Sequence, residues 1–230
     1  MTPHLTNIDV IVFDVLGTLV DQPAGLRRAI AEAAPTAEPQ LVDTLVAQWQ
    51  LHVETRQAAI SGGYQPYVGS ETLDAEAAAL ILQELSNRGL KVPPAAATLL
   101  ASASQRLPPW PDSVSGLERL TARIPVLALS NSEPTSLLHL SANSGMRWHA
   151  GVSADDVSAY KPAPALYDRA IKVANRPADR ILMVAAHAWD LRAAHRAGMR
   201  TCYVARPVGD PPRNDDPFDA SISSLAELVR

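Results

Sequence analysis

The stretch that decides the fold is IDVIVFDVLGTLVD, residues 8–21. Its first part, Ile8 to Phe13, is a short β-branched run that predicts a buried strand. Asp14 follows directly and Gly17 comes soon after, so we expect the strand to break into a tight loop. A carboxylate placed there, near backbone N–H groups, can act as a nucleophile. A helix N-cap or an Asx-turn is the plainer interpretation of Asp14.

Later parts of the chain repeat this pattern of an apolar run that ends in polar residues. The intervening segments 162–174 and 190–198 have the apolar spacing and the end signals of helices. Strands that alternate with helices predict an α/β fold, with a three-layer, Rossmann-like core around a parallel sheet. The further strands are expected at residues 126–129, 181–186 and 201–205.

The segment between the first and second strands differs, because it contains no convincing strand. Helical patterns cover residues 41–60, 73–85 and 95–103, separated by glycines and prolines. A helical block at this point predicts an inserted all-helical cap. We predict a core domain of residues 1–20 and 108–230, and a cap of residues 21–107.

Length and composition limit the function classes. The chain has 230 residues, 47% of them hydrophobic and 19% charged, which predicts an ordered globular protein. A net charge of −4 without a long basic run argues against nucleic acid or an anionic membrane as partner. The apolar runs are too short to span a bilayer. The single cysteine, Cys202, and an N-terminus that does not resemble a signal sequence predict a cytoplasmic protein.

Polar residues follow several of these strands. The carboxyl ends of parallel strands meet at one edge of the sheet, where ligands bind. We therefore expect Asp14, Ser130, Asn131 and Asp190 to converge, with Lys161 in the same half of the core. Plainer roles are helix capping for Ser130 and Asp190 and a solvated surface charge for Lys161.

Four segments together resemble a known family, the haloacid dehalogenase superfamily, and most closely its L-2-haloacid dehalogenase (type II) branch. That resemblance implies a core with a helical cap. The segments are FDVLGTLVD (13–21), LALSNS (127–132), YKPAPALY (160–167) and MVAAHAWDLRAAHRAGMRTCYVARP (183–207).

The resemblance also implies roles. Asp14 would be the nucleophile, oriented by the Thr18 hydroxyl, and Lys161 would neutralise negative charge beside it. Ser130 and Asn131 would bind the substrate carboxylate or the leaving group.

Further roles concern the last two motifs. Tyr167 matches the spacing Lys-Pro-x-x-x-x-Tyr and is expected near the substrate. Asp190 matches the acidic residue of the last motif, which would position or activate water, and Trp189 matches an aromatic residue next to the substrate.

Leu16 lies two residues after Asp14, where phosphatases of the superfamily carry a second aspartate as general acid. Leucine cannot donate a proton, and loss of a general acid costs about 10²–10⁴-fold in rate. Halide is a stable anion that needs no proton, so Leu16 favours carbon–halogen displacement. The resemblance thus implies hydrolysis of a small anionic 2-haloacid through an ester of Asp14, without cofactor or metal.

Leu16, expected to contact the substrate, stands where the branch usually has a tyrosine, and two further substrate-binding positions depart from the branch. Gln50 follows Trp49 where the branch carries an arginine that clamps the substrate, and glutamine has no charge to replace it. Arg56, Arg27 or Arg28 could compensate. His187 replaces a polar residue of the last motif and could be a base, a halide ligand or a pH-sensitive donor.

These departures leave two alternatives open. The first is a Mg²⁺-dependent phosphatase of the same superfamily, and the second is a non-catalytic binding protein on this scaffold. An apolar helix face in the cap could also support a homodimer.

Overall fold

The computed structural model describes residues 7–229, and they contain a sheet of 6 strands in the order β3-β2-β1-β4-β5-β6. All five pairings are parallel, so this is the sheet of an α/β core. The strands are β1 (Val10–Asp14), β2 (Val126–Ser130), β3 (Ala150–Ser153), β4 (Ile181–Ala185), β5 (Arg200–Val204) and β6 (Ala220–Ile222).

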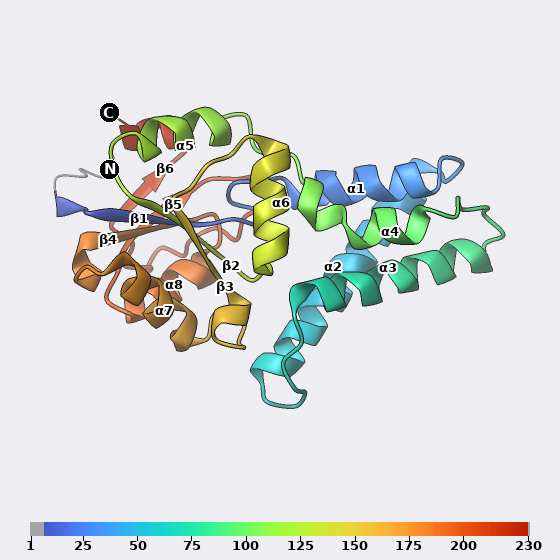
Figure 1. Cartoon of the computed structure of the whole chain (residues 1–230), viewed down its shortest axis with the longest axis horizontal. Helices are drawn as coiled ribbons and strands as arrows, with labels where there is room; N and C mark the ends of the chain where they lie inside the picture. The colour runs from blue at the N-terminus through green and yellow to red at the C-terminus, as the bar shows by residue number, and fades with distance from the viewer. Residues whose placement is uncertain (1–6, 230) are drawn as a thin grey trace.

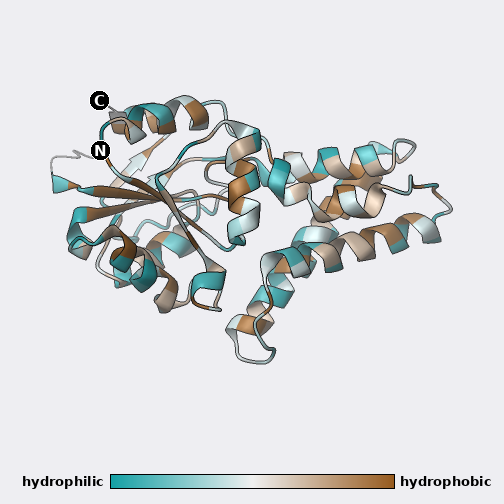
Figure 2. Ribbon diagram, in the orientation of Figure 1, coloured by the Kyte–Doolittle hydropathy of each residue, from teal (hydrophilic) through white to brown (hydrophobic). Residues whose placement is uncertain are grey.

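The sheet is covered by helices on both faces (Figure 1). A parallel sheet buries both of its faces, which explains why β1, β2 and β4 are apolar along their lengths (Figure 2). Helices α5 (Ser113–Thr121), α6 (Pro134–Ser144) and the 3₁₀ helix η5 (Leu225–Val229) pack on one face. Helices α7 (Pro164–Ala174) and α8 (Ala188–Arg196) pack on the other. The predicted three-layer core is confirmed.

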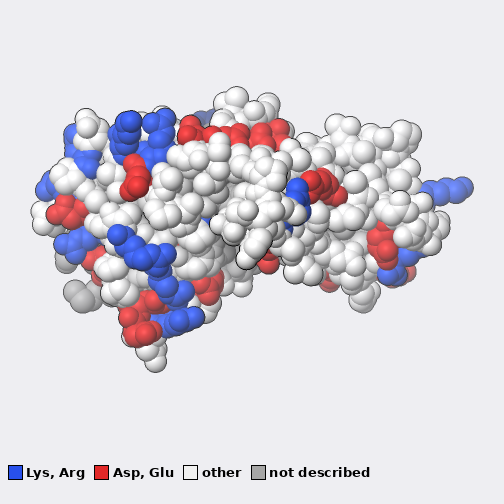
Figure 3. Space-filling view, turned by 90° about the horizontal axis from the view of Figure 1, so that it is seen from below, with Lys and Arg blue, Asp and Glu red and all other residues white. Residues whose placement is uncertain are grey.

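The segment between β1 and β2 is helical and projects from one end of the core (Figure 1). On the face seen from below, Lys and Arg side chains gather mainly over the core and not over this segment (Figure 3). Its helices pack around their own buried cluster, which includes Leu26, Leu45, Trp49, Ile81 and Leu100. The expected all-helical cap is therefore present. Its helices are α1 (Gln22–Ala33), α2 (Pro39–Ser61), α3 (Ser70–Asn87), α4 (Ala96–Ala101) and the 3₁₀ helix η2 (Ala103–Arg106).

The chain enters and leaves the cap at adjacent points. Asp21 N donates to Pro108 O at 2.9 Å, and Trp110 N donates to Leu19 O at 3.1 Å. Trp110 Nε1 also donates to Gly17 O at 3.0 Å. The two crossings are thus hydrogen-bonded to each other and to the loop after β1.

Several elements were absent from the sequence prediction. Strands β3 and β6 have the sequences AGVS and ASI, which are too short and too poor in large side chains to give a strand pattern. Helix α1 was missed although Asp21 caps it, accepting from Ala24 N at 3.0 Å. Helix α7 begins at Pro164 rather than at Pro162.

Residues 1–6, on which part of the signal-sequence prediction depends, lie outside the described residues. Within residues 7–229, no helix combines the length and the apolar character needed to cross a bilayer.

Candidate active site

Asp14 is the last residue of β1 and is almost completely buried, with 6% of its surface exposed. Thr18 Oγ1 donates a hydrogen bond of 2.6 Å to Asp14 Oδ2, and it accepts one of 2.8 Å from Ala186 N. These two bonds tie the loop after β1 to the end of β4. The Asp14 carboxylate is therefore held in one orientation.

Lys161 supplies the positive charge next to Asp14. Its Nζ donates to Asp14 Oδ1 at 2.9 Å and to Asp190 Oδ2 at 2.7 Å, and its side chain is 1% exposed. The second oxygen of Asp190 accepts from the Tyr167 hydroxyl at 2.6 Å. Because buried charges are costly unless paired, this chain of contacts allows two carboxylates to lie side by side.

The charges in this group influence one another. Burial alone would raise the pKa of Asp14, but the Lys161 charge, the nearby His187 and the hydrogen bonds from Thr18 and Lys161 outweigh it. The pKa of Asp14 is therefore below its ordinary value, and the carboxylate is ionised at neutral pH.

The two partners of Asp14 are affected differently. Burial would lower the pKa of Lys161, but the charges of Asp14 and Asp190 raise it, so the amine stays protonated. Burial raises the pKa of Asp190, Lys161 opposes this, and Asp14 adds to it, with a net rise. Of the two carboxylates, Asp14 lines the cleft and is the one whose ionised form is favoured.

Ser130 is the last residue of β2 and Asn131 follows it, and both line the same cleft as Asp14. Ser130 Oγ accepts from Ser132 N at 3.1 Å, a local turn rather than a cap of α6. Asn131 Oδ1 accepts from Lys161 N at 2.8 Å, and its Nδ2 donates to Gln57 Oε1 at 3.2 Å. Asn131 therefore connects the Lys161 backbone to the cap.

His187 lies on the other side of Asp14. Its Nε2 is 3.2 Å from Leu16 O and 4.0 Å from Asp14 Oδ2, and its ring stacks on that of Trp189. Gly17 has a φ of +79°, and a Cβ there would come within 2.6 Å of His187 Nε2. Glycine is thus required by both the backbone and the histidine ring.

A cleft of about 550 Å³ lies between this edge of the core and the cap. Eight of the eleven predicted site residues line it: Asp14, Leu16, Gln50, Ser130, Asn131, Lys161, His187 and Trp189.

The other three lie behind this surface. Thr18, Tyr167 and Asp190 are fully buried and do not line the cleft. Tyr167 hydrogen-bonds Asp190 instead of facing a substrate, which corrects its predicted substrate contact. Asp190 is also not the N-cap of α8, because His187 occupies that position.

The cleft contains polar residues that the sequence reading missed, among them Glu54 and Gln57 of α2 and Asp210. The spacing of Glu54 and Gln57 from Gln50 is helical and could have been found. Which side of the cap faces the core was not visible in the sequence.

The arginines considered as replacements at Gln50 are engaged elsewhere. Arg56 forms two hydrogen bonds to Glu76, at 2.8 and 3.0 Å, and Arg27 pairs with Asp43. None of the arginines in residues 7–229 lines the cleft.

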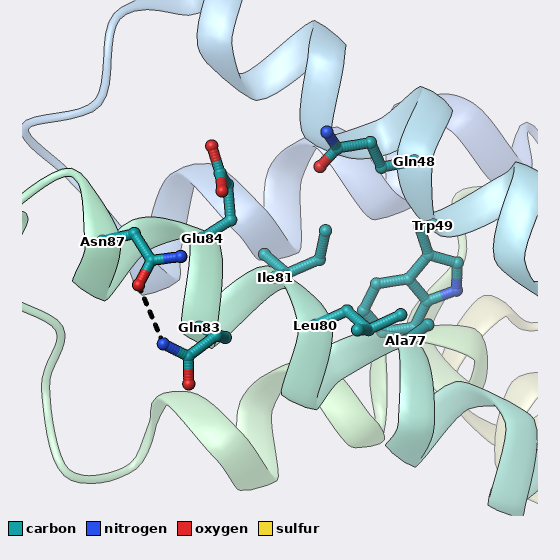
Figure 4. Close-up of a pocket in the computed structure, with 8 residues that line it drawn as sticks. All are labelled: Gln48, Trp49, Ala77, Leu80, Ile81, Gln83, Glu84 and Asn87. Atoms are coloured by element: carbon teal, nitrogen blue, oxygen red, sulfur yellow. Dashed lines mark hydrogen bonds between the residues drawn. The ribbon is translucent and has the colours of Figure 1, made fainter.

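A second, smaller pocket of about 330 Å³ lies between α2 and α3 (Figure 4). Trp49, Ala77, Leu80 and Ile81 form its apolar side. Glu84 is its one titratable residue, so this pocket offers less chemistry than the cleft at Asp14.

Comparisons with known proteins agree with this geometry. The chain is 29% identical over 229 residues to an (S)-2-haloacid dehalogenase of Pseudomonas putida, covering 97% of this chain and 96% of the relative. A solved L-2-haloacid dehalogenase is 28% identical over 97% of each chain with a TM-score of 0.83. A solved defluorinating L-2-haloacid dehalogenase is 29% identical over 96% of this chain and 94% of its own, with a TM-score of 0.84. A family model described as haloacid dehalogenase-like hydrolase matches residues 8–198, so the chain belongs to the haloacid dehalogenase-like hydrolases.

Proposed function

We propose that this hydrolase cleaves the carbon–halogen bond of small 2-haloacids through an ester of Asp14. The observation that carries the proposal is a buried, ionised Asp14 held by Thr18 and Lys161, with the apolar Leu16 two residues on. Similarity to (S)-2-haloacid dehalogenases over nearly the whole chain supports it.

In the first step, one Asp14 oxygen attacks the carbon that carries the halogen and forms a C–O bond. The carbon–halogen bond breaks, the carbon inverts, and halide leaves with the bonding electrons. Halide needs no proton, which suits the side chain of Leu16. The Lys161 charge, fixed 2.9 Å from Asp14, offsets the repulsion between an anionic substrate and an anionic nucleophile.

In the second step, water attacks the carbonyl carbon of the Asp14 ester. The ester C–O bond breaks, a 2-hydroxy acid leaves, and the water oxygen remains in the Asp14 carboxylate, with one proton passing to solvent. Asp190 does not line the cleft, so its role is exerted through Lys161. His187 lies 4.0 Å from Asp14 and lines the cleft, which supports a role in orienting the attacking water.

The anionic end of the substrate has partners on the core wall. Ser130, Asn131, His187 and Trp189 all line the cleft beside Asp14. We propose that they hold the substrate carboxylate and the departing halide.

Mass spectrometry of the Asp14 peptide tests the mechanism. Turnover of 2-chloropropionate in H₂¹⁸O should place ¹⁸O in Asp14, whereas the first 2-hydroxy acid formed should carry unlabelled oxygen. Label in the product of a single turnover, with none in Asp14, would contradict an Asp14 ester. Absence of halide release from chloro-, bromo- and fluoroacetate and from 2-chloropropionate would contradict the function itself.

The alternative of a Mg²⁺-dependent phosphatase fits this donor set less well. Lys161 Nζ already occupies the space between Asp14 and Asp190, the two carboxylates that would hold the ion. Among the described residues, His, Cys, Asp and Glu side chains form no group of three that could bind a metal. Hydrolysis of an aryl phosphate that EDTA abolishes would support the phosphatase.

Three coarser expectations complete the proposal. Residues 21–107 would form a cap domain separate from residues 1–20 and 108–230, the protein would act in the cytoplasm, and a homodimer could form through the cap. Leu51 of α2 and Leu80 of α3 are exposed apolar side chains of the cap through which such a contact would form. Sedimentation of the purified protein tests the dimer.

A further inference from the structure

One face of α2 forms the cap wall of the cleft. Gln50, Glu54, Gln57 and Ser61 all line it, at helix positions i, i+4, i+7 and i+11. This polar stripe, defined by these four residues, runs along the helix opposite Asp14. The stripe therefore meets whatever part of a substrate extends away from the reacting carbon.

The stripe offers acceptors and a negative charge but no cation. Among residues 7–229, Lys161 is the one lysine or arginine that lines the cleft. Its ammonium group already pairs with both Asp14 and Asp190. Glu54 and Asp210 add two further carboxylates. An anionic group on the cap side would meet the carboxylates of Glu54 and Asp210 and no cation, whereas a cationic hydrogen-bond donor would be attracted by both.

Two side chains of the stripe, those of Gln50 and Glu54, are available for a ligand. Gln57 Oε1 accepts from Asn131 Nδ2 at 3.2 Å. The side chains of Gln50 and Glu54 make no hydrogen bond or ion pair within the described part of the chain. Glu54 is exposed at the mouth of the cleft and Gln50 is half-buried. An unpaired carboxylate and amide in a cleft are groups that a ligand can satisfy.

The cleft is also larger than the smallest substrates require. Chloroacetate has five heavy atoms and fills on the order of 100 Å³, taking the share of about 30 Å³ per water molecule as a guide. The cleft holds about 550 Å³. A longer chain can therefore reach from Asp14 to the stripe.

We propose that the stripe selects 2-haloacids whose chain ends in a hydrogen-bond donor, and that Glu54 favours an ammonium group there. This inference rests on the proposed dehalogenation and adds its substrate class. In this arrangement the substrate carboxylate lies on the core wall and its ammonium group lies against Glu54. The carboxylate of Glu54 accepts a charge-assisted hydrogen bond from the ammonium group, which is stronger than a bond between neutral groups.

Halide release from three matched substrates tests this selection: 2-chlorobutanoate, 2-chloro-4-hydroxybutanoate and 2-chloro-4-aminobutanoate. We expect kcat/KM for the amino substrate to exceed that for 2-chlorobutanoate by about tenfold or more. Glu54→Gln should abolish most of this ratio through KM, and Glu118→Gln, an exposed residue of α5, should keep it. A ratio near one in the wild type, or one unchanged in Glu54→Gln, would overturn the inference.

A halogen-free probe separates this inference from the proposed reaction. Calorimetry should show that 4-aminobutanoate binds about tenfold tighter than butanoate, and that Glu54→Gln removes the difference. This result would support the stripe even if no haloacid releases halide. Equal binding of the two acids, with halide still released from 2-chlorobutanoate, would overturn the stripe and leave the dehalogenation standing.

Discussion

The two walls of the cleft are built in opposite ways. On the core wall, Asp14 and Lys161 are buried and charged, and each makes at least two hydrogen bonds to fixed partners. On the cap wall, Gln50 and Glu54 are half-buried or exposed and unpaired within the described residues. Under the proposed function, this difference implies that residues at the sheet edge carry out the chemistry and residues of the cap helix select the substrate. Changes on the core wall should reduce kcat, and changes on the cap wall should alter KM.

The harshest test of this division is Asp14→Asn. Asparagine keeps the shape but cannot form the ester, so we expect kcat to fall by about 10⁴-fold or more while the fold is retained. Halide release and far-UV circular dichroism measure the two effects.

The matched control is Asp168→Asn, which changes an exposed aspartate of α7. It should leave both the rate of halide release and the far-UV circular dichroism unchanged. Ligand binding that survives in Asp14→Asn together with an unaltered cellular role would instead favour the non-catalytic alternative.

Lys161→Met should affect rate and stability together. It removes the charge that offsets Asp14 and Asp190, and breaking a buried pair costs about 3–5 kcal/mol. We also expect about 10³-fold lower kcat, because an anionic substrate would face two uncompensated carboxylates. Urea unfolding and halide release measure both. A stable, active Lys161→Met protein would break the comparison between the walls.

Asp74 is a buried carboxyl of the cap, and it sharpens the comparison because it serves no cleft chemistry. Burial raises its pKa to about 6 from an ordinary 3.8. Protonated Asp74 therefore contributes its full share to the free energy of unfolding below pH 4. This contribution is lost as the pH rises through 6. The loss amounts to about 3 kcal/mol, since one pKa unit is about 1.4 kcal/mol.

Asp74→Asn should thus be more stable than the wild type at pH 8 and similar to it at pH 3.5. Unfolding in urea at both values measures the change, with Asp168→Asn as control. Equal stability differences at the two pH values would show that Asp74 does not titrate in this range.

Tyr167→Phe tests the layer behind the core wall. It removes the hydroxyl that donates to Asp190 and leaves a buried oxygen without this bond, at a cost of about 1–3 kcal/mol. Because Tyr167 does not line the cleft, KM should change less than kcat and stability. A selective rise in KM would restore the substrate contact predicted from the sequence.

The smallest expected effect belongs to Gln57→Leu on the cap wall. It removes the 3.2 Å bond from Asn131, worth about 1 kcal/mol. We expect KM to rise about fivefold with little change in kcat. A large fall in kcat would instead mean that the cap fixes Lys161 through Asn131.

Much of the fold could be read from the chain because β1, β2, β4 and β5 are long enough to give an apolar run. Strands β3 and β6 could not, since glycine, serine and alanine dominate them and tertiary pairing alone makes them strands. Helix α1 was not predicted because Gly25 interrupts the helical pattern near its start, although a proline and an N-cap mark where the helix begins.

The site residues also fall into those that the sequence predicted and those that it did not. Asp14, Ser130, Lys161 and Asp190 were predicted to converge, because parallel strands bring their carboxyl ends to one edge. The separation of cleft residues from buried supporting residues such as Tyr167 depends on burial, which periodicity does not give. Glu54 was missed because no sequence pattern fixes how the cap is oriented over the sheet.

The paired crossings into the cap have a consequence for how such a molecule can change. Asp21 N and Pro108 O are 2.9 Å apart, so the two ends of the helical insertion lie next to each other where they join the core. A short turn that joined these two points would leave the register of β1 with β2 undisturbed. The position of the crossings would thus allow the insertion to be exchanged for another during evolution without a change in the order of the core strands.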